Sequence, residues 1–180
     1  ITAMKVMILG SNGQLGKSLK QYFQKTKYEC YFFNRSDLDI NDHITLNKKF
    51  ISIKPNIVIN SCAYTAVVKA EENFEEANNV NNVAVGKLAQ QCLSNDCFLI
   101  HVSTDYVFDG LSENPYVEND KKNPIGVYGK TKLDGEYKIL ESGCKFCIIR
   151  TSWIFGEFGN NFLKTILKLA SKNDELSVIS

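Results

Sequence analysis

The chain has 180 residues, 21 of them basic and 20 acidic, so its net charge at pH 7 is close to zero. This length suits a single domain with a sizeable core. The balanced charge gives no basic patch typical of nucleic-acid or anionic-membrane binding, so we expect neither partner and instead a small-molecule ligand. No apolar run is long enough to span a membrane and no signal peptide is evident, which predicts a cytoplasmic protein whose natural start is Met4.

Apolar runs alternate with helical patterns along the whole chain. Strands are predicted at 5–10, 29–33, 56–60, 97–103 and 145–150, and helices at 13–25, 44–52, 74–94, from Tyr128 onward, and at 161–172. This alternation predicts a doubly wound, parallel α/β sheet of the Rossmann type. The strand runs are continuously apolar, which predicts that helices cover both faces of the sheet. The polar segment 109–123 is predicted to be an exposed, mobile loop, and 176–180 resembles the start of a further strand.

The cysteines are scattered, and most lie in or beside the predicted strands. We therefore interpret them as buried free thiols, since cysteine packs as a small hydrophobic residue. The sequence "CKFC" at 144–147 has the spacing of a redox motif. It leads into a strand instead of opening a helix, which argues against redox chemistry.

A glycine-rich loop follows the first predicted strand. The sequence "GSNGQLG" places Gly10, Gly13 and Gly16 three residues apart, directly before a predicted helix. Glycines allow a tight turn and a close approach of the backbone to a pyrophosphate, which the helix N-terminus attracts. The alternative is a purely structural turn. Because the strand, the loop and the helix agree, we predict a dinucleotide site here.

The end of the second strand bears on the choice of cofactor. An acidic residue that binds the ribose is typical at this point of NAD sites, but the chain has Asn34 and Arg35. Arg35 could pair with the 2′-phosphate of NADP, a charge-assisted contact worth roughly 1.5 to 3 kcal/mol. The alternative is a solvated surface arginine. The sequence therefore favours NADPH, with NADH as a second option.

Tyr128 and Lys132 lie four residues apart at the start of a predicted helix, which places them on one face. A free tyrosine has a pKa of about 10, and a neighbouring ammonium together with an oxidised nicotinamide should lower it. Ser103 and Thr104 end the fourth strand, at the sheet edge where ligands bind. The alternative is an ordinary amphipathic helix. The combination with the glycine loop predicts a catalytic group of Tyr128, Lys132 and Thr104.

The chain resembles the extended short-chain dehydrogenase/reductase superfamily and, within it, the dTDP-4-dehydrorhamnose reductase family. The stretches that carry the resemblance are "GSNGQLG", "DLDI", "PNIVINSCAYTAVVKAE", "HVSTDYVFDG", "VYGKTKLDGE" and "RTSWIFGEFGNNF". The resemblance implies that residues 4–180 form a Rossmann-type NAD(P)-binding domain cut short at its C-terminal end. It also implies reduction of the 4-keto group of dTDP-4-dehydro-L-rhamnose by NADPH, assigns no metal ligands, leaves a metal requirement open, and is compatible with a homodimer.

The resemblance further assigns residues by position. Gly13, Gln14 and Leu15 would hold the pyrophosphate, Asp39 and Ile40 would flank the adenine, and Ala63, Tyr64 and Thr65 would line the cofactor site. Tyr128 would donate the proton, Lys132 would bind the nicotinamide ribose and tune Tyr128, and Thr104 would bind the sugar oxygen. Asp105 and Trp153 would border the sugar. Trp153, a flat apolar wall in this reading, could alternatively be a core aromatic.

Two residues depart from the family pattern. Val68 replaces an acid, and Gly126 replaces the usual asparagine two residues before the tyrosine. Two other functions remain open from the sequence. One is a different extended reductase or epimerase for another nucleotide sugar, and the other is a non-catalytic, reductase-like regulatory subunit, which would be expected to lack Tyr128 or Lys132.

Overall fold

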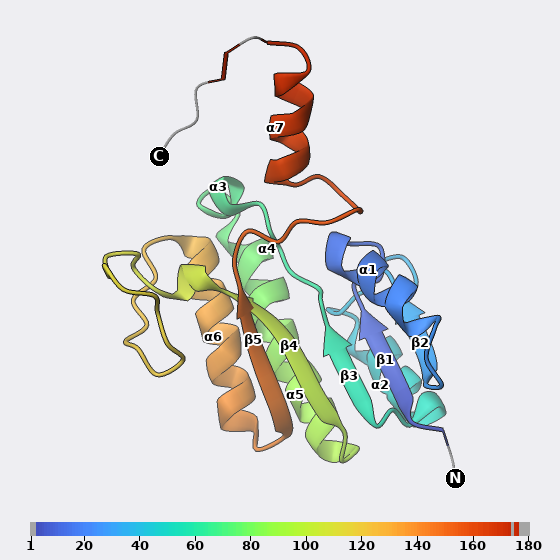
Figure 1. Cartoon of the computed structure of the whole chain (residues 1–180). Helices are drawn as coiled ribbons and strands as arrows, with labels where there is room; N and C mark the ends of the chain where they lie inside the picture. Colours follow the sequence, from blue (N-terminus) through green and yellow to red (C-terminus); the bar gives the residue numbers. More distant parts are fainter. Residues whose placement is uncertain (1–2, 174, 177–180) are drawn as a thin grey trace.

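One parallel sheet organises the chain. The structure, a computed structural model, describes residues 3–173, 175 and 176. The strands β1 (Lys5–Leu9), β2 (Glu29–Phe33), β3 (Ile57–Asn60), β4 (Phe98–Thr104) and β5 (Lys145–Thr151) lie in the order β2-β1-β3-β4-β5 (Figure 1). The predicted doubly wound α/β fold is confirmed. Of the strand expected at the chain end, residues 177–180 lie outside the described residues.

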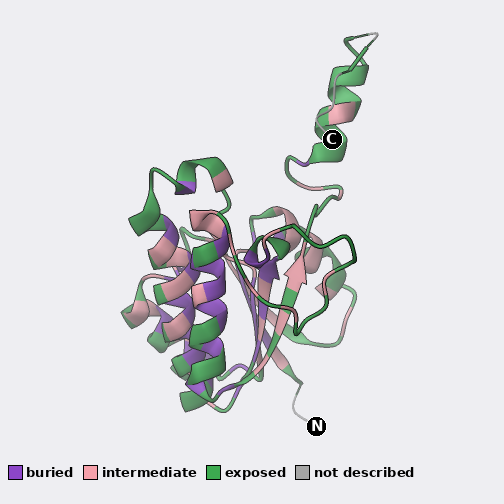
Figure 2. Cartoon of the chain, turned by 90° about the vertical axis from the view of Figure 1, so that its left-hand side faces the viewer, coloured by how far each residue is buried: buried purple, intermediate pink, exposed green. Residues whose placement is uncertain are grey.

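Helices pack on both sides of this sheet. The helices in the described part of the chain are α1 (Gln14–Phe23), α2 (His43–Ile53), α3 (Val67–Ala70), α4 (Phe74–Asn78), α5 (Ala84–Ser94), α6 (Val127–Ser142) and α7 (Phe162–Ala170), of which α7 does not pack on the sheet. Successive strand residues point to opposite faces, so Met7 and Leu9 join a core with α2, α5 and α6, whereas Val6 and Ile8 pack against α1. The buried stripes of the helices face the sheet in Figure 2. All these strands are parallel, but β2 lies on one side of β1 and β3 to β5 lie on the other. The strand order therefore reverses between β1 and β3, which opens a crevice at their carboxyl ends.

The edge strand β5 differs from the prediction. Its burial alternates, with Cys147 exposed and Ile149 44% exposed, while Phe146 and Ile148 pack against the core. The prediction that every strand is covered on both faces is therefore wrong for β5, because α1 covers the β1 side of the sheet only. The reading of all cysteines as buried thiols is wrong for Cys147, although all six are free.

The predicted helix at 74–94 is interrupted. Between α4 and α5 the backbone forms a π-helical turn, η1 (Asn79–Val83). Such turns are often found at functional sites, and asparagine is a poor residue for the interior of an α-helix. The short helix α3 and a single 3₁₀ turn, η2 (Asp105–Val107), were not predicted.

The segment 109–123 is exposed, as predicted, but it is hydrogen-bonded. The Asp109 carboxylate accepts hydrogen bonds from the hydroxyl of Tyr116 at 2.8 Å and the side-chain amide of Asn123 at 3.1 Å. The Tyr116 ring also stacks on Phe108, with ring centroids 4.3 Å apart. The predicted mobility of the loop stays a prediction.

The last helix, α7, lies apart from the sheet (Figure 1) and buries no residue. The segment before it is nevertheless tied to α1, since the Gln14 side-chain amide donates to the Ile154 carbonyl at 2.9 Å. No helix in the described part of the chain is long and apolar enough to cross a membrane.

Candidate active site

The glycine loop forms a tight turn at the carboxyl end of β1. Gly10 has a φ of +81°, a conformation that favours glycine, and a Cβ at Gly16 would lie 2.1 Å from the Gly10 carbonyl oxygen. Helix α1 then begins at Gln14, with no side-chain cap and no acidic residue in its first turn. Its first backbone N–H groups are therefore available to a negatively charged ligand, as a pyrophosphate site requires.

Two adjoining cavities lie at this end of the sheet. The first cavity has a volume of about 490 Å³. Its lining includes Gly13, Gln14, Leu15, Gly16, Thr104, Asp105, Tyr128, Lys132 and Trp153. The second cavity has a volume of about 420 Å³, and its lining includes Gly10, Asn34, Arg35, Asp39, Ile40 and Tyr64. Gly13, Ser61, Ala63 and Thr65 line both. All the site residues predicted from the sequence thus face one or the other cavity, although Ser61 was not among them.

Gly129 explains how α6 approaches β4. A Cβ at this position would lie 2.2 Å from the carbonyl oxygen of Tyr106, in the η2 turn after β4. Only glycine therefore lets the first turn of α6 lie against the residues that follow Thr104. This close approach brings Tyr128 and Thr104 into the same cavity. The glycine that directly follows the tyrosine in the sequence has a packing role.

The pKa of Tyr128 is raised. Burial is the largest cause, the nearby Asp105 and Tyr106 add to it, and a hydrogen bond with Thr104 acts in the opposite direction. In the chain alone burial outweighs the other effects, and the lowering predicted from the sequence for a site that also holds an oxidised nicotinamide stays a prediction. The phenol is therefore protonated at neutral pH and has a proton to donate, but the raised pKa makes it a weaker acid than a free tyrosine.

Lys132 is completely buried beneath the cavity. Its Nζ donates a hydrogen bond to the Val102 carbonyl at 2.7 Å and lies 3.4 Å from Nε2 of His101. Burial lowers the pKa of Lys132 to about 8, although Glu136 and Cys62 act to raise it. The amine is therefore held against the backbone of β4, and the residue that carries it lies one helical turn after Tyr128.

Arg35 lies at the outer end of the second cavity, with 74% of its side chain exposed. Its Nε donates to Asp39 at 3.3 Å, and its guanidinium lies 4.0 Å from Glu76. Burial alone would raise the pKa of Asp39, but hydrogen bonds from Asn41 and Arg35 hold it below its usual value. Arg35 is thus exposed, as a solvated residue would be, and also faces the cavity.

Asp105 and Trp153 lie at the mouth of the first cavity. The Thr104 hydroxyl donates to the Asp105 carboxylate at 3.1 Å. Trp153 is 72% exposed, has a φ of +50°, and packs edge-to-face against Phe162. Trp153 is therefore not part of the core of the described residues.

Asn81 lines neither cavity but supports the site, and no sequence pattern assigned a role to it. It is fully buried in η1, and its side-chain Oδ1 accepts a hydrogen bond from the Tyr64 N–H at 2.8 Å. Its side-chain Nδ2 donates to the Tyr64 carbonyl and to the Thr131 hydroxyl, both at 3.2 Å. Asn81 therefore fixes the loop after β3 against α6. The signal was the run "ANNVNN", since asparagine disfavours a helix interior.

The departure at Gly126 has a structural counterpart. Gly126 precedes α6 without a side-chain cap, and the Glu71 carboxylate accepts from the Val127 N–H at 2.8 Å. A Cβ at Gly126 would lie 2.8 Å from that carboxylate oxygen, so glycine leaves room for Glu71 to cap the helix. Val68 is 83% exposed on α3, and nothing in the structure explains its replacement of an acid.

Comparison with known proteins agrees with this geometry. The family model described as the RmlD substrate binding domain matches residues 4–180. The chain belongs to this family. Within the described residues, no group of three or more His, Cys, Asp or Glu side chains could hold a metal.

Relatives of this family member match nearly all of its length and share its fold. It is 43% identical over 177 residues to a dTDP-4-dehydrorhamnose reductase of Aggregatibacter actinomycetemcomitans, a match that covers 98% of the chain and 60% of the relative. The crystal structure of a dTDP-4-dehydrorhamnose reductase from Clostridium acetobutylicum has a TM-score of 0.92 and 42% identity, covering 96% of this chain and 61% of that one. A Bacillus anthracis reductase, solved in complex with NADP, has a TM-score of 0.92 and 35% identity, with the same coverage. The resemblance inferred from the sequence is confirmed, and the chain spans about 60% of the length of these relatives.

Proposed function

We propose that this chain supplies the cofactor-binding and proton-donating part of an NADPH-dependent reductase. The enzyme would reduce the 4-keto group of dTDP-4-dehydro-L-rhamnose and yield dTDP-L-rhamnose. The observation that carries the proposal is that Tyr128, Lys132 and Thr104 line the same cavity as the α1 end of the glycine loop. The similarity to reductases of that name supports the choice of sugar.

The residues present fit a dinucleotide. Two cavities that share a wall suit a ligand of two halves joined by a pyrophosphate, and the uncapped start of α1 lies at their junction. Gly10, Gly13, Gln14, Leu15 and Gly16 would hold the pyrophosphate, and Asn34, Arg35, Asp39 and Ile40 the adenosine end. Ala63, Tyr64 and Thr65 would line the middle. When bound, NADPH supplies the hydride.

The chain's own residues would orient the substrate and move one proton. Thr104 would hydrogen-bond the sugar oxygen, and Asp105 and Trp153 would border the ring. The phenol of Tyr128, which is protonated at neutral pH, would donate its proton to the oxygen of the reduced carbon. Lys132 would bind the nicotinamide ribose and tune the pKa of Tyr128. A homodimer and a cytoplasmic location also stay predictions.

The proposal is tested by comparing the 180-residue chain with a version extended to the length of its relatives. We expect saturable NADPH binding by both, because the residues assigned to the dinucleotide lie between Gly10 and Lys132. We expect weak sugar reduction by the chain alone, since binding energy from the remote nucleotide of the substrate helps to orient the reacting carbon. Loss of NADPH absorbance should report turnover. A preference of the extended version for another nucleotide sugar would redirect the substrate assignment.

Arg35 should decide the preference between cofactors. If it pairs with the 2′-phosphate, Arg35→Ala should weaken NADPH binding by about 1.5 kcal/mol, roughly tenfold, and leave NADH binding nearly unchanged. The neighbouring Asp39 and Glu76 would then face the phosphate without a compensating charge. Titrations with both cofactors measure this, with the exposed Lys138→Ala as a control. Equal losses for NADPH and NADH would remove the phosphate role.

A further inference from the structure

A chain of three buried polar side chains lies beneath the proposed site. Asn60 of β3 and His101 of β4 are in register as neighbours on adjacent strands, and both are fully buried. Nδ2 of Asn60 lies 3.1 Å from Nδ1 of His101, and Nε2 of His101 lies 3.4 Å from Nζ of Lys132. Burial of three such groups is costly unless each hydrogen bond has a matching donor and acceptor.

The backbone fixes the orientation of the Asn60 amide. Its Oδ1 accepts a hydrogen bond from the Cys62 N–H at 3.0 Å, so the NH₂ group is the one that faces His101. The amide can only donate from this side, and Nδ1 of His101 must therefore accept. A neutral imidazole that accepts at Nδ1 carries its proton on Nε2. That proton points toward the amine of Lys132.

This arrangement favours a neutral Lys132. A neutral amine can accept the Nε2–H of His101 with its lone pair and still donate to the Val102 carbonyl. An ammonium has three donors and no acceptor, so it would place an N–H against the N–H of His101. Charging Lys132 would thus require His101 to move its proton to Nδ1, where it would face the Asn60 NH₂ group.

We infer that Asn60 and His101 are positioning residues that hold the amine of Lys132 at the base of the site and favour its neutral form. The catalytic role of this arrangement rests on the proposed function, whereas the hydrogen-bond geometry of the three side chains is independent of it. A lysine that changes its protonation state at little cost beside Tyr128 could take part in restoring the proton that the phenol gives up.

The other ionisable groups around Lys132 act in different directions. Glu136, one turn along α6, and Cys62, after β3, both favour the ammonium, while burial disfavours it. Burial and the charge of Lys132 hold the pKa of His101 well below its usual value, so this imidazole stays neutral. Tyr128 lies one turn before Lys132 and has a raised pKa, so it adds no negative charge at neutral pH.

The tautomer of His101 can be observed directly. The chain has only two histidines, so long-range ¹H–¹⁵N spectra of the ¹⁵N-labelled protein should contain two imidazoles, and His43→Gln identifies the signals of His101. At pH 9, above the Lys132 pKa of about 8, we expect a neutral imidazole with its proton on Nε2. A proton on Nδ1 at that pH, or a charged imidazole, would overturn the inference.

Reversing the hydrogen bond of Asn60 provides a second test. In Asn60→Asp a carboxylate would accept from Nδ1–H, move the His101 proton to Nδ1 and leave Nε2 to accept from a Lys132 ammonium. The titration midpoint of Lys132, followed by its ¹³Cε shift, should rise from about 8 by about one pH unit or more. Asn56→Asp, at the exposed start of β3, controls for the added charge. An unchanged tautomer and midpoint in a folded Asn60→Asp would contradict the inference.

Both measurements are made without cofactor or sugar. If His101 shows the other tautomer but the extended protein reduces the sugar with NADPH, only the positioning role fails. If the predicted tautomer is found but no nucleotide sugar is reduced by the extended protein, only the proposed function fails.

Discussion

Replacing Tyr128 with phenylalanine should lower turnover by at least about a hundredfold, because a positioned general acid is typically worth 10²- to 10⁴-fold. The ring and its packing remain, and only the hydroxyl that faces the cavity is removed. Cofactor affinity should therefore change no more than a few-fold. Steady-state rates and NADPH titrations of the protein extended to the length of its relatives separate the two effects.

Tyr106→Phe is the matched control for this change. Tyr106 packs edge-to-face on Tyr128, with ring centroids 5.5 Å apart, and is 52% exposed at the same cavity. The loss of its hydroxyl should leave turnover within a few-fold. Undiminished turnover in Tyr128→Phe would remove Tyr128 from the mechanism, and an equal loss in both variants would point to packing instead of proton transfer.

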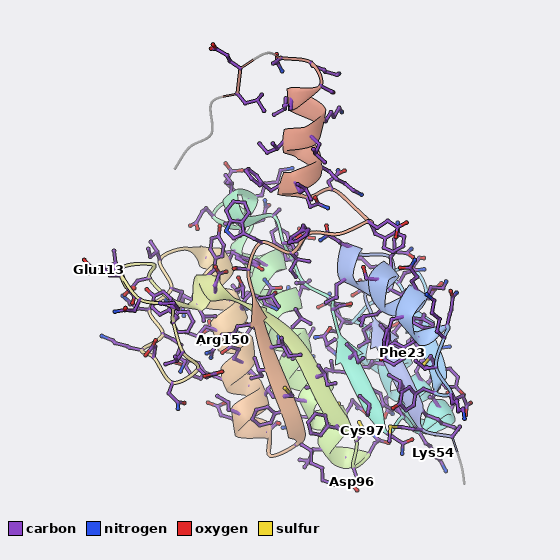
Figure 3. All side chains as sticks on the ribbon, in the orientation of Figure 1. Phe23, Lys54, Asp96, Cys97, Glu113 and Arg150 are labelled. Carbon is purple, nitrogen blue, oxygen red and sulfur yellow. The ribbon has the colours of Figure 1, made fainter. Side chains whose placement is uncertain are left out.

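Glu136→Ala should lower the free energy of unfolding by about 3 to 5 kcal/mol, the usual cost of leaving one partner of a buried ion pair alone. The Glu136 side chain is 1% exposed and accepts two hydrogen bonds from Arg150, at 3.0 and 2.7 Å, and one from the Ser103 hydroxyl at 2.5 Å. Arg150, a residue of β5, also donates to the Glu118 carbonyl, and Figure 3 shows it on the side of the sheet where the loop with Glu113 lies. Urea unfolding of the 180-residue chain measures the loss.

The control lies on the same helix. Glu141 forms an exposed pair with Lys138 at 3.6 Å, and such pairs contribute at most about 1 kcal/mol. Glu141→Ala should therefore have little effect. If both variants lost similar, small amounts of stability, the Glu136–Arg150 pair would not hold the loop and α6 against the sheet.

The features that the sequence predicted are those set by local patterns. The glycine loop and the order of strands and helices depend on neighbouring residues, and Tyr128 and Lys132 share a helix face because of their spacing. These patterns brought the predicted site residues to one edge of the sheet.

The features that it missed depend on contacts between distant segments. The pairing of Asn60 with His101 requires the register of β3 and β4, and the role of Asn81 requires the loop after β3 to meet α6. The burial of Tyr128, which raises its pKa in the chain alone, is not revealed by the helix spacing. The exposure of β5 reflects which helices cover it, and an apolar run carries no information on that.

The central claim is that residues of this chain direct a hydride to the sugar and supply its proton. The most direct test uses NADPH deuterated at the transferable position of the nicotinamide, with dTDP-4-dehydro-L-rhamnose and the protein extended to the length of its relatives. The account predicts deuterium at C4 of the product sugar in a single configuration, by NMR, and almost none with Tyr128→Phe over the same time. Product without deuterium at C4, or no consumption of NADPH although it binds, would contradict the account.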